Sequence, residues 1–360
     1  HNPPTSLGGS AMKLAISIGY SGATMSIPMD YIRDCERLGY DSVWTAEAYG
    51  SDAVTPLAYI AALTTKIKLG TSIMQIPART PANCAMTMST LDAISGGRAL
   101  CGLGLSGPQV VEGWHGVPYG KPAARMREYV EILRKIWARE EPVSYQGKEY
   151  QLPYAGPGAT GLGKPLKSIL HGRQIPIYLA TMGPVNVRTT AELADGWLPI
   201  WFSPYQMHHY RPHLDEGFAR RKDGKTAKDF DIAPGVSVVI TDDVKAGLAL
   251  QKPTLALYVG GMGARDKNFH NDAVASYGYA DAAKQIQDLY LSGRKAEAEA
   301  AVPDELCDEM SLVGPVERIR ERYRRYVDAG VTTIMVQSRQ PEALELMAEL
   351  ARETREPAAV

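Results

Sequence analysis

The segment 175–197 combines a short apolar run with a helical pattern, and small residues lie between the two. The apolar run ends at Ala180, Gly183 and Pro184 form a turn, and Val185 begins a predicted helix. The first N–H groups of a helix have no partner within the helix, and the helix dipole adds partial positive charge at that end. This strand-turn-helix pattern is therefore typical of a site that binds phosphate or carboxylate.

A carboxylate, Glu47, follows the second apolar run, within the stretch 43–53. A carboxylate at the end of a strand can act as a general base, contact a cofactor or cap the next helix. Trp114 and His115 lie after the fourth apolar run, where they either pack within a loop or form a wall over a planar ring. We predict Glu47 as the catalytic residue.

Three other motifs do not fit the sites that they resemble. Residues 102–107 match the glycine pattern of dinucleotide-binding folds, but Pro108 follows at once, so we expect a strand whose backbone approaches a ligand closely. Residues 158–165 resemble a phosphate loop that lacks the final Ser or Thr. The histidines of 208–213 are separated by a proline, and we expect a solvated helix face there. We therefore predict no metal site.

The elements that must position these residues alternate between strands and amphipathic helices. The predicted strands are 13–19, 41–45, 67–73, 98–105, 175–181, 195–200, 230–240 and 332–337. Eight strands alternating with helices predict an α/β fold, a closed (β/α)8 TIM barrel with insertions, and the alternative is a doubly wound open sheet. In such a barrel the chemistry occurs at the C-terminal ends of the strands, where Glu47 and Ala180 lie.

Two insertions interrupt this alternation. Residues 140–174 contain six Gly and four Pro and show little periodicity, whereas about 242–328 is mostly helical apart from 258–269. Long loops of this kind are often lids, so we expect 140–174 and the loop 258–270 to cover the substrate side. We predict one barrel domain over 12–360 and interpret residues 1–11 as an appended leader.

The composition excludes several classes of function. The 360 residues include 39 Lys and Arg against 40 Asp and Glu, so no basic field exists to attract nucleic acid or anionic membranes. No apolar run approaches the roughly 18–20 residues of a membrane span. The four cysteines, Cys35, Cys84, Cys101 and Cys307, form no CxxC pair, and we expect buried free thiols. A cytoplasmic protein fits these features best.

Five segments together resemble a known family. They are 37–53, 66–81, 91–116, 175–197 and 311–337. In this order they resemble the luciferase-like monooxygenase superfamily, and more closely its branch of coenzyme F420-dependent oxidoreductases of actinobacterial type, related to methylenetetrahydromethanopterin reductase. The resemblance implies a (β/α)8 barrel, usually a homodimer, that binds flavin or deazaflavin at the C-terminal ends of its strands.

The resemblance also implies roles for particular residues. It places a non-prolyl cis peptide between Ser72 and Ile73, where the backbone supports the cofactor ring, and places the cofactor phosphate at the turn 180–186. The implied cofactor-binding residues are Ser72, Ile73, Met74, Leu105, Ser106, Gly107, Ala180, Thr181, Met182, Gly183, Pro184, Val185 and Asn186. Sugar-phosphate dehydrogenases of this branch carry Asp-His and Glu where this chain has Glu47-Ala48 and Gly107-Pro108, so their histidine-based proton abstraction is not expected here.

The resulting hypothesis is an oxidoreductase that moves a hydride between C5 of coenzyme F420 and an unidentified small organic substrate. Deazaflavin has carbon where flavin has nitrogen, so it is suited to two-electron transfer, and Glu47 would tune the ring or exchange protons. The alternative is an FMN-dependent monooxygenase or flavin-binding protein, since both cofactors share a ring shape and one phosphate. A third possibility is a barrel lyase or isomerase that holds a phosphorylated substrate at 180–186.

Overall fold

The computed structural model describes residues 11–263, 265–266 and 268–354. The predicted leader therefore lies outside the described residues, except for Ala11. Among the described residues, no helix is both long and apolar enough to cross a membrane.

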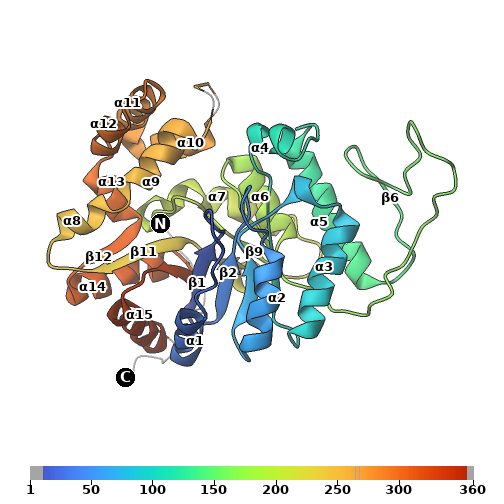
Figure 1. The fold of residues 1–360 in the computed structure, drawn as a ribbon, viewed down its shortest axis with the longest axis horizontal. Coiled ribbons are helices and arrows are strands. Elements are labelled where there is room, and N and C mark those ends of the chain that lie inside the picture. The colour runs from blue at the N-terminus through green and yellow to red at the C-terminus, as the bar shows by residue number, and fades with distance from the viewer. Residues whose placement is uncertain (1–10, 264, 267, 355–360) are drawn as a thin grey trace.

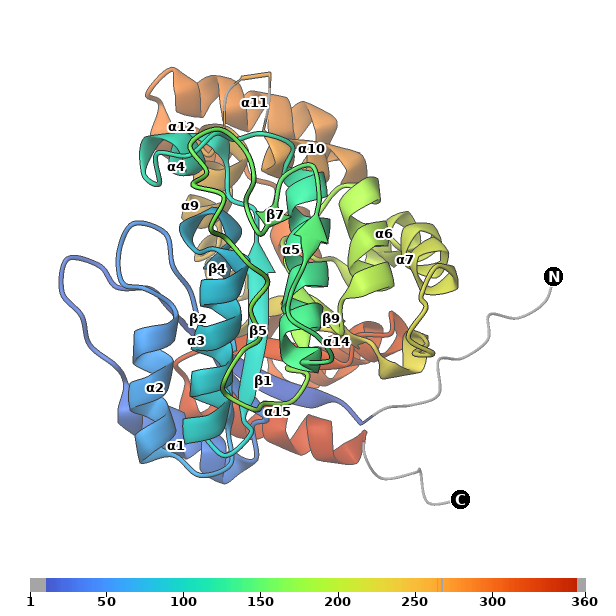
Figure 2. The same cartoon turned by 90° about the vertical axis from the view of Figure 1, so that its right-hand side faces the viewer.

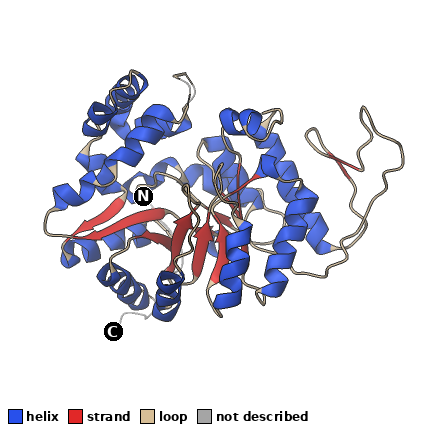
Figure 3. Ribbon diagram, in the orientation of Figure 1, coloured by secondary structure: helices blue, strands red, loops and turns tan. Residues whose placement is uncertain are grey.

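Short parallel strands form a curled sheet at the centre of the molecule (Figures 1 and 3). They are β1 (Lys13–Gly19), β2 (Ser42–Thr45), β3 (Lys68–Thr71) with β4 (Met74–Gln75), β5 (Ala99–Gly104), β8 (Ile177–Leu179), β9 (Gly196–Trp197), β10 (Asp231–Ile232), β11 (Gly235–Ile240) and β13 (Thr333–Gln337). All eight predicted strands are present.

The ring of strands closes through the segment 231–240. Its first part, β10, pairs with β9, and its second part, β11, pairs with β13, which in turn pairs with β1. Pro234 separates the two parts because it has no N–H to donate, although its carbonyl accepts the N–H of Met335 at 2.9 Å. The predicted (β/α)8 barrel is confirmed, and the open doubly wound sheet is not observed.

Helices surround the sheet and bury its outer face (Figure 3). They are α1 (Met29–Leu38), α2 (Val54–Leu63), α3 (Pro81–Ile94), α5 (Pro122–Ala138), α6 (Pro184–Leu193), α7 (Arg211–Ala219), α14 (Val316–Asp328) and α15 (Pro341–Glu353). Several of them begin with proline, which suits a first helical position because its φ is fixed and the missing N–H would have no partner there.

The region 242–328 differs from its prediction in one element. It contains a strand, β12 (Ser311–Gly314), which pairs with β11 and extends the sheet beyond the ring. The remaining elements include α8 (Val244–Ala249), α9 (Lys252–Ala256), a π-helical turn at Leu257–Gly261, α10 (Phe269–Val274), α11 (Ala280–Leu291), α12 (Lys295–Ala300) and α13 (Asp304–Glu309). These helices bury a separate hydrophobic cluster, and Figure 1 shows α10 to α12 beyond one side of the sheet.

The insertion 140–174 takes a different position from the one expected. It forms a small antiparallel hairpin of β6 (Tyr145–Gln146) and β7 (Gln151–Leu152), and it projects outward beyond α5 (Figure 1). Ile169 within it is 93% exposed. The prediction that this insertion covers the substrate side is therefore wrong, because it extends from the side of the barrel and not over the strand ends.

Candidate functional site

The floor of the site is the upper layer of the barrel interior. Inside the ring, a cluster of buried side chains includes Trp44, Tyr178 and Leu198, and the partly buried Ile73 and Ala180 pack against it. Ile73 follows β3 and Ala180 follows β8, so both lie at the C-terminal ends of their strands. This is the end at which barrels of this kind carry their active sites.

The peptide bond between Ser72 and Ile73 is cis, as the family resemblance implied. Gly104 lies against Ile73, and a Cβ at that glycine would approach Cδ1 of Ile73 to 2.6 Å. The glycine therefore lets β5 approach the Ile73 side chain closely. Met74, by contrast, is buried in the core beneath the helices, so its side chain contributes to packing and not to the floor of the site.

Glu47 is almost fully enclosed by hydrogen-bond donors. Its carboxylate receives two hydrogen bonds from the guanidinium of Arg79, at 2.5 and 2.9 Å, and others from the backbone N–H groups of Gln75 and Ala53 at 2.8 and 3.0 Å. The side chain is 6% exposed, and that of Arg79 is 16% exposed. Both carboxylate oxygens are thus engaged, and Glu47 joins the end of β2 to β4 and to the start of α2.

Gln75 connects three loops of the site. Its Nε2 donates to Oγ of Ser106 at 3.0 Å, and its Oε1 lies 2.8 Å from Nε2 of His115. Because the amide oxygen can only accept, Nε2 of His115 carries the proton and Nδ1 does not need one. Ser106 has a φ of 60°, which turns the chain after β5 toward Gln75. Gln75 and Arg79 were not predicted as site residues, and their closeness to Ile73 in the chain is the one signal that could have identified them.

A cavity of about 250 Å³ adjoins these residues. Glu47, Arg79, Trp114 and His115 line it, together with Ser51 and other residues of the loop after β2. The segment predicted as a loop after β5 begins with a short helix, α4 (Pro108–Gly113), for which Gly107 is the N-cap. Trp114 follows this helix directly and contacts the ring of Tyr49, with the ring centroids 6.3 Å apart.

The turn after β8 is open where an anion would bind. Gly183 is exposed, and a Cβ there would meet nothing within 4 Å. Helix α6 begins at Pro184, and Oδ1 of Asn186 is buried without a hydrogen-bond partner. The hydroxyl of Thr181 is engaged with that of Thr190 at 2.8 Å, so this side chain secures α6. Residues 183–186 therefore fit a phosphate group through the N–H groups at the start of α6, while Oδ1 of Asn186 is an acceptor and leaves Nδ2 as the donor of that side chain.

Tyr258 and His270 lie near the chain that follows β9, at the mouth of the barrel. Nε1 of Trp201, after β9, donates to Nδ1 of His270 at 3.0 Å, and Tyr258 packs against both rings. Burial raises the pKa of Tyr258, and the neighbouring Tyr20 and Tyr49 raise it further. Burial lowers the pKa of His270 from 6.5 to about 4.

This low pKa predicts a pH dependence of stability. The unfolded chain protonates His270 near its ordinary value of 6.5, whereas the folded site does so only near pH 4, so the free energy of unfolding should fall as the pH is lowered between these values. The loss should reach about 2–3 kcal/mol. Urea unfolding at pH 7 and 4.5 measures it. His270→Gln should reduce this loss, while the same change at the exposed His171 should leave it intact.

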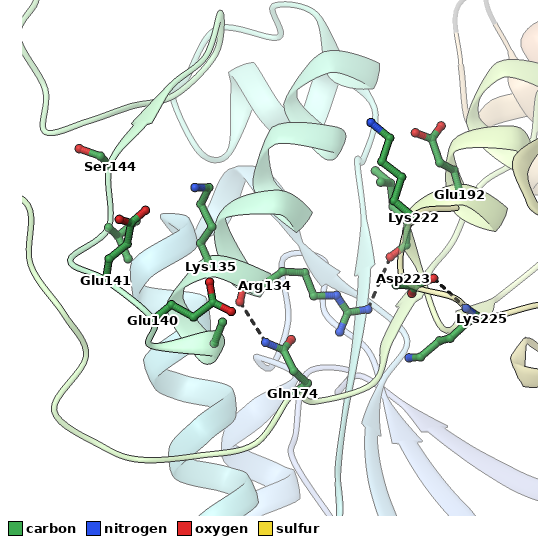
Figure 4. Close-up of a pocket in the computed structure, with 13 residues that line it drawn as sticks. Arg134, Lys135, Glu140, Glu141, Ser144, Gln174, Glu192, Lys222, Asp223 and Lys225 are labelled. Atoms are coloured by element: carbon green, nitrogen blue, oxygen red, sulfur yellow. Dashed lines mark hydrogen bonds between the residues drawn. The ribbon is translucent and has the colours of Figure 1, made fainter. Parts of the chain in front are cut away.

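A larger cavity, of about 550 Å³, lies at the opposite end of the barrel (Figure 4). Charged side chains from α5 and from 222–225 surround it, and Arg134 and Lys225 both bind Asp195 just before β9. Burial alone would raise the pKa of Asp195, but these two cations outweigh it and hold that pKa below its usual range. Four of the charged side chains that line this cavity form ion pairs near the N-terminal ends of the strands, which favours a stabilising role; they are Arg134, Glu192, Asp223 and Lys225.

The described residues contain no cluster of three or more His, Cys, Asp or Glu side chains arranged to hold a metal ion. The four cysteines are buried and free, as predicted.

Comparisons with known proteins agree with this arrangement. A family model described as "Luciferase-like monooxygenase" matches residues 15–333. A Mycobacterium tuberculosis protein that carries the name of a coenzyme F420-dependent oxidoreductase is 48% identical over 94% of this chain and 99% of its own length. The 5,10-methylenetetrahydromethanopterin reductase of Archaeoglobus fulgidus is 30% identical over 86% of this chain and 88% of its own.

The fold is also that of a solved structure. The coenzyme F420-dependent tetrahydromethanopterin reductase of Methanopyrus kandleri superimposes with a TM-score of 0.74 at 24% identity, over 94% of this chain and 98% of that chain. The chain belongs to the luciferase-like monooxygenase family.

Proposed function

We propose that this chain, as one domain over 12–360, is an oxidoreductase that transfers a hydride between coenzyme F420 and a small organic substrate. The observation that carries the proposal is the convergence of two features at one end of the barrel. Ile73 after its cis peptide offers a support for a planar ring, and the open turn 183–186 offers a place for a phosphate. The name of the M. tuberculosis relative supports deazaflavin as the cofactor.

Different residues of the site would bind different parts of the cofactor. Ser72 and Ile73 would support the ring from below, and Leu105, Ser106 and Gly107 would border it just after the end of β5. The N-terminus of α6 would hold the phosphate, and Nδ2 of Asn186 would donate to it, because the Oδ1 of this side chain can only accept. When bound, deazaflavin supplies two-electron hydride chemistry at C5, and the protein orients the ring and excludes water.

Glu47 remains our prediction for a functional residue, and its contacts support a positioning role. Because Arg79 and two backbone N–H groups already engage both oxygens, Glu47 fixes the β4 segment that follows Ile73. His115 is better placed for proton exchange, since Gln75 fixes its Nε2–H and leaves Nδ1 for a partner in the adjoining cavity. The pairing of Gln75 with His115 supports this assignment.

The four free cysteines support a reducing compartment, and we propose the cytoplasm. We also propose a homodimer. Its support is a set of exposed apolar side chains on the neighbouring helices α2 and α3, namely Tyr59, Leu63, Met86 and Ile94.

Titration of the protein with F420 and with FMN, followed by fluorescence quenching, tests the proposed function. F420 should bind more tightly than FMN, and Asn186→Asp should weaken F420 binding at least tenfold, since it places a negative charge beside the phosphate. Asn83→Asp puts the same charge at the exposed start of α3 and should leave the affinity unchanged. Tight FMN binding without a response to F420 would establish a flavin protein instead. A response to neither would favour a lyase or isomerase.

A further inference from the structure

Aromatic side chains surround the mouth of the barrel. Five loops at the C-terminal ends of the strands contribute them, and we define this aromatic collar as Tyr20, Tyr49, Trp114, Trp201, Tyr258 and His270. Figures 1 and 2 show that α4, which leads to Trp114, and α10, which carries His270, lie at the same end of the barrel.

The collar consists of two arcs of ring contacts. In one arc Tyr49 and Trp114 lie with their centroids 6.3 Å apart. In the other arc Tyr258 contacts Trp201 at 5.4 Å and His270 at 4.9 Å. Both arcs lie in segments that follow the C-terminal ends of strands, at the same end of the barrel. Their rings therefore border the same mouth of the barrel.

The side chains of the first arc are left uncovered by their own chain. Tyr49 is 66% exposed, Trp114 is 63% exposed and the nearby Tyr20 is 49% exposed. Met25 and Met262, in loops at the same end of the barrel, are exposed as well. Large aromatic faces and flexible thioethers that remain open at a site are suited to contact with a ligand of apolar character.

The charges beside the collar disfavour an anion. Among the residues that line the adjoining cavity, Glu47 and Asp52 are acidic and Arg79 is basic, so their net charge is −1. Arg79 is fully engaged with Glu47 and has little capacity to bind a phosphate or carboxylate of a substrate. The net negative charge of these lining residues would therefore repel an anionic substrate, and none of them offers a free cation to bind it.

We propose that the substrate is an uncharged organic molecule with a ring body, held between the two arcs of the aromatic collar above the cofactor site. The proposal rests on the proposed function and adds the class of substrate to it. Aromatic side chains bind the flat faces of a ring by offset or edge-to-face contact, and the missing free cation excludes sugar phosphates and other substrates recognised by an anionic group.

Two matched probes test this proposal, acetophenone and 4-acetylbenzoate, which differ by one carboxylate. Binding of each probe to the F420-loaded protein is measured by saturation-transfer NMR, and their relative affinities by competition between the two probes. Acetophenone should bind at least tenfold more tightly than 4-acetylbenzoate. The double variant Tyr49→Ala/Trp114→Ala should weaken acetophenone binding at least fivefold, and its affinity for F420 should stay within a few fold of the unchanged protein.

Tyr154→Ala is the matched control, since this tyrosine is 56% exposed but lies in the projecting insertion 140–174. It should leave acetophenone binding unchanged. Equal or tighter binding of 4-acetylbenzoate, no binding of either probe, or undiminished acetophenone binding by the double variant would each overturn the proposal. Failure of the unchanged protein to bind F420 is a separate result, and it would overturn the proposed function itself.

Discussion

Glu47→Gln should lower the free energy of unfolding by about 3 kcal/mol, because it leaves the guanidinium of Arg79 charged and unpaired in a mostly buried position. Denaturant unfolding followed by circular dichroism measures this loss. Hydride transfer should slow as well, since Glu47 fixes the β4 segment after Ile73. The affinity for F420 should change by no more than a few fold, because the proposed phosphate site at 183–186 follows β8, whereas Glu47 contacts the segments after β2 and β3.

The double variant Glu47→Gln/Arg79→Gln distinguishes the loss of the ion pair from the cost of leaving one buried charge unpaired. Removing both charges should recover more than half of the lost stability, since an unpaired buried charge costs more than a missing pair. Glu149→Gln is a suitable comparison, because Glu149 forms one 3.2 Å ion pair with Arg125 outside the site. It should cost less stability and leave hydride transfer unaffected. A Glu47→Gln protein as stable as the unchanged chain would contradict the role given to this ion pair.

Gly102→Ala should prevent the barrel from folding stably. A Cβ at Gly102 would lie 1.7 Å from the backbone oxygen of Thr71 on the neighbouring strand. Because the obstacle is backbone, no side-chain rotation relieves it, and the strands β3 and β5 would have to separate. We expect a loss of about 3 kcal/mol or more, at the upper end of the range for overpacked cores. Soluble yield and the midpoint of thermal unfolding measure it.

Gly113→Ala is the matched substitution for comparison. Gly113 ends α4, and a Cβ there would meet nothing within 4 Å. The midpoint of thermal unfolding should stay within a few degrees of the unchanged protein. If Gly102→Ala unfolded at the same temperature as Gly113→Ala, the close contact between β3 and β5 would not determine the stability of the barrel.

The strand pattern of the barrel could be predicted because the strands are short apolar runs, most of them buried along their length. Its interruption at Pro234 was also foreseeable, since proline has no N–H for the sheet. The strand Ser311–Gly314 was missed because it is short and lies between helices, and only its pairing with β11 defines it. The position of the insertion 140–174 could not be read from its composition, which indicates a long loop but not its direction.

The strand-turn-helix geometry at 183–186 could be predicted because one chain segment forms it, and its binding of a phosphate stays a prediction. Glu47 and Arg79 are separated by 32 positions in the sequence, and no local sequence pattern predicts their ion pair. The glycines of 102–107 were expected to let the backbone approach a ligand. Gly102 and Gly104 instead accommodate the neighbouring strand and Ile73. Glycine spacing thus indicates a close approach, while the structure alone shows what approaches.

Gln75 has a consequence for attempts to alter this protein. The backbone N–H of Gln75 donates to Glu47, and its side-chain amide hydrogen-bonds to Ser106 and His115. Substitutions at these three positions share a partner, so their effects should combine in a non-additive way. Libraries that aim to change substrate preference will therefore retain more folded members if they vary the tips of the loops, such as Tyr49 and Trp114, and keep Gln75 and its three partners constant.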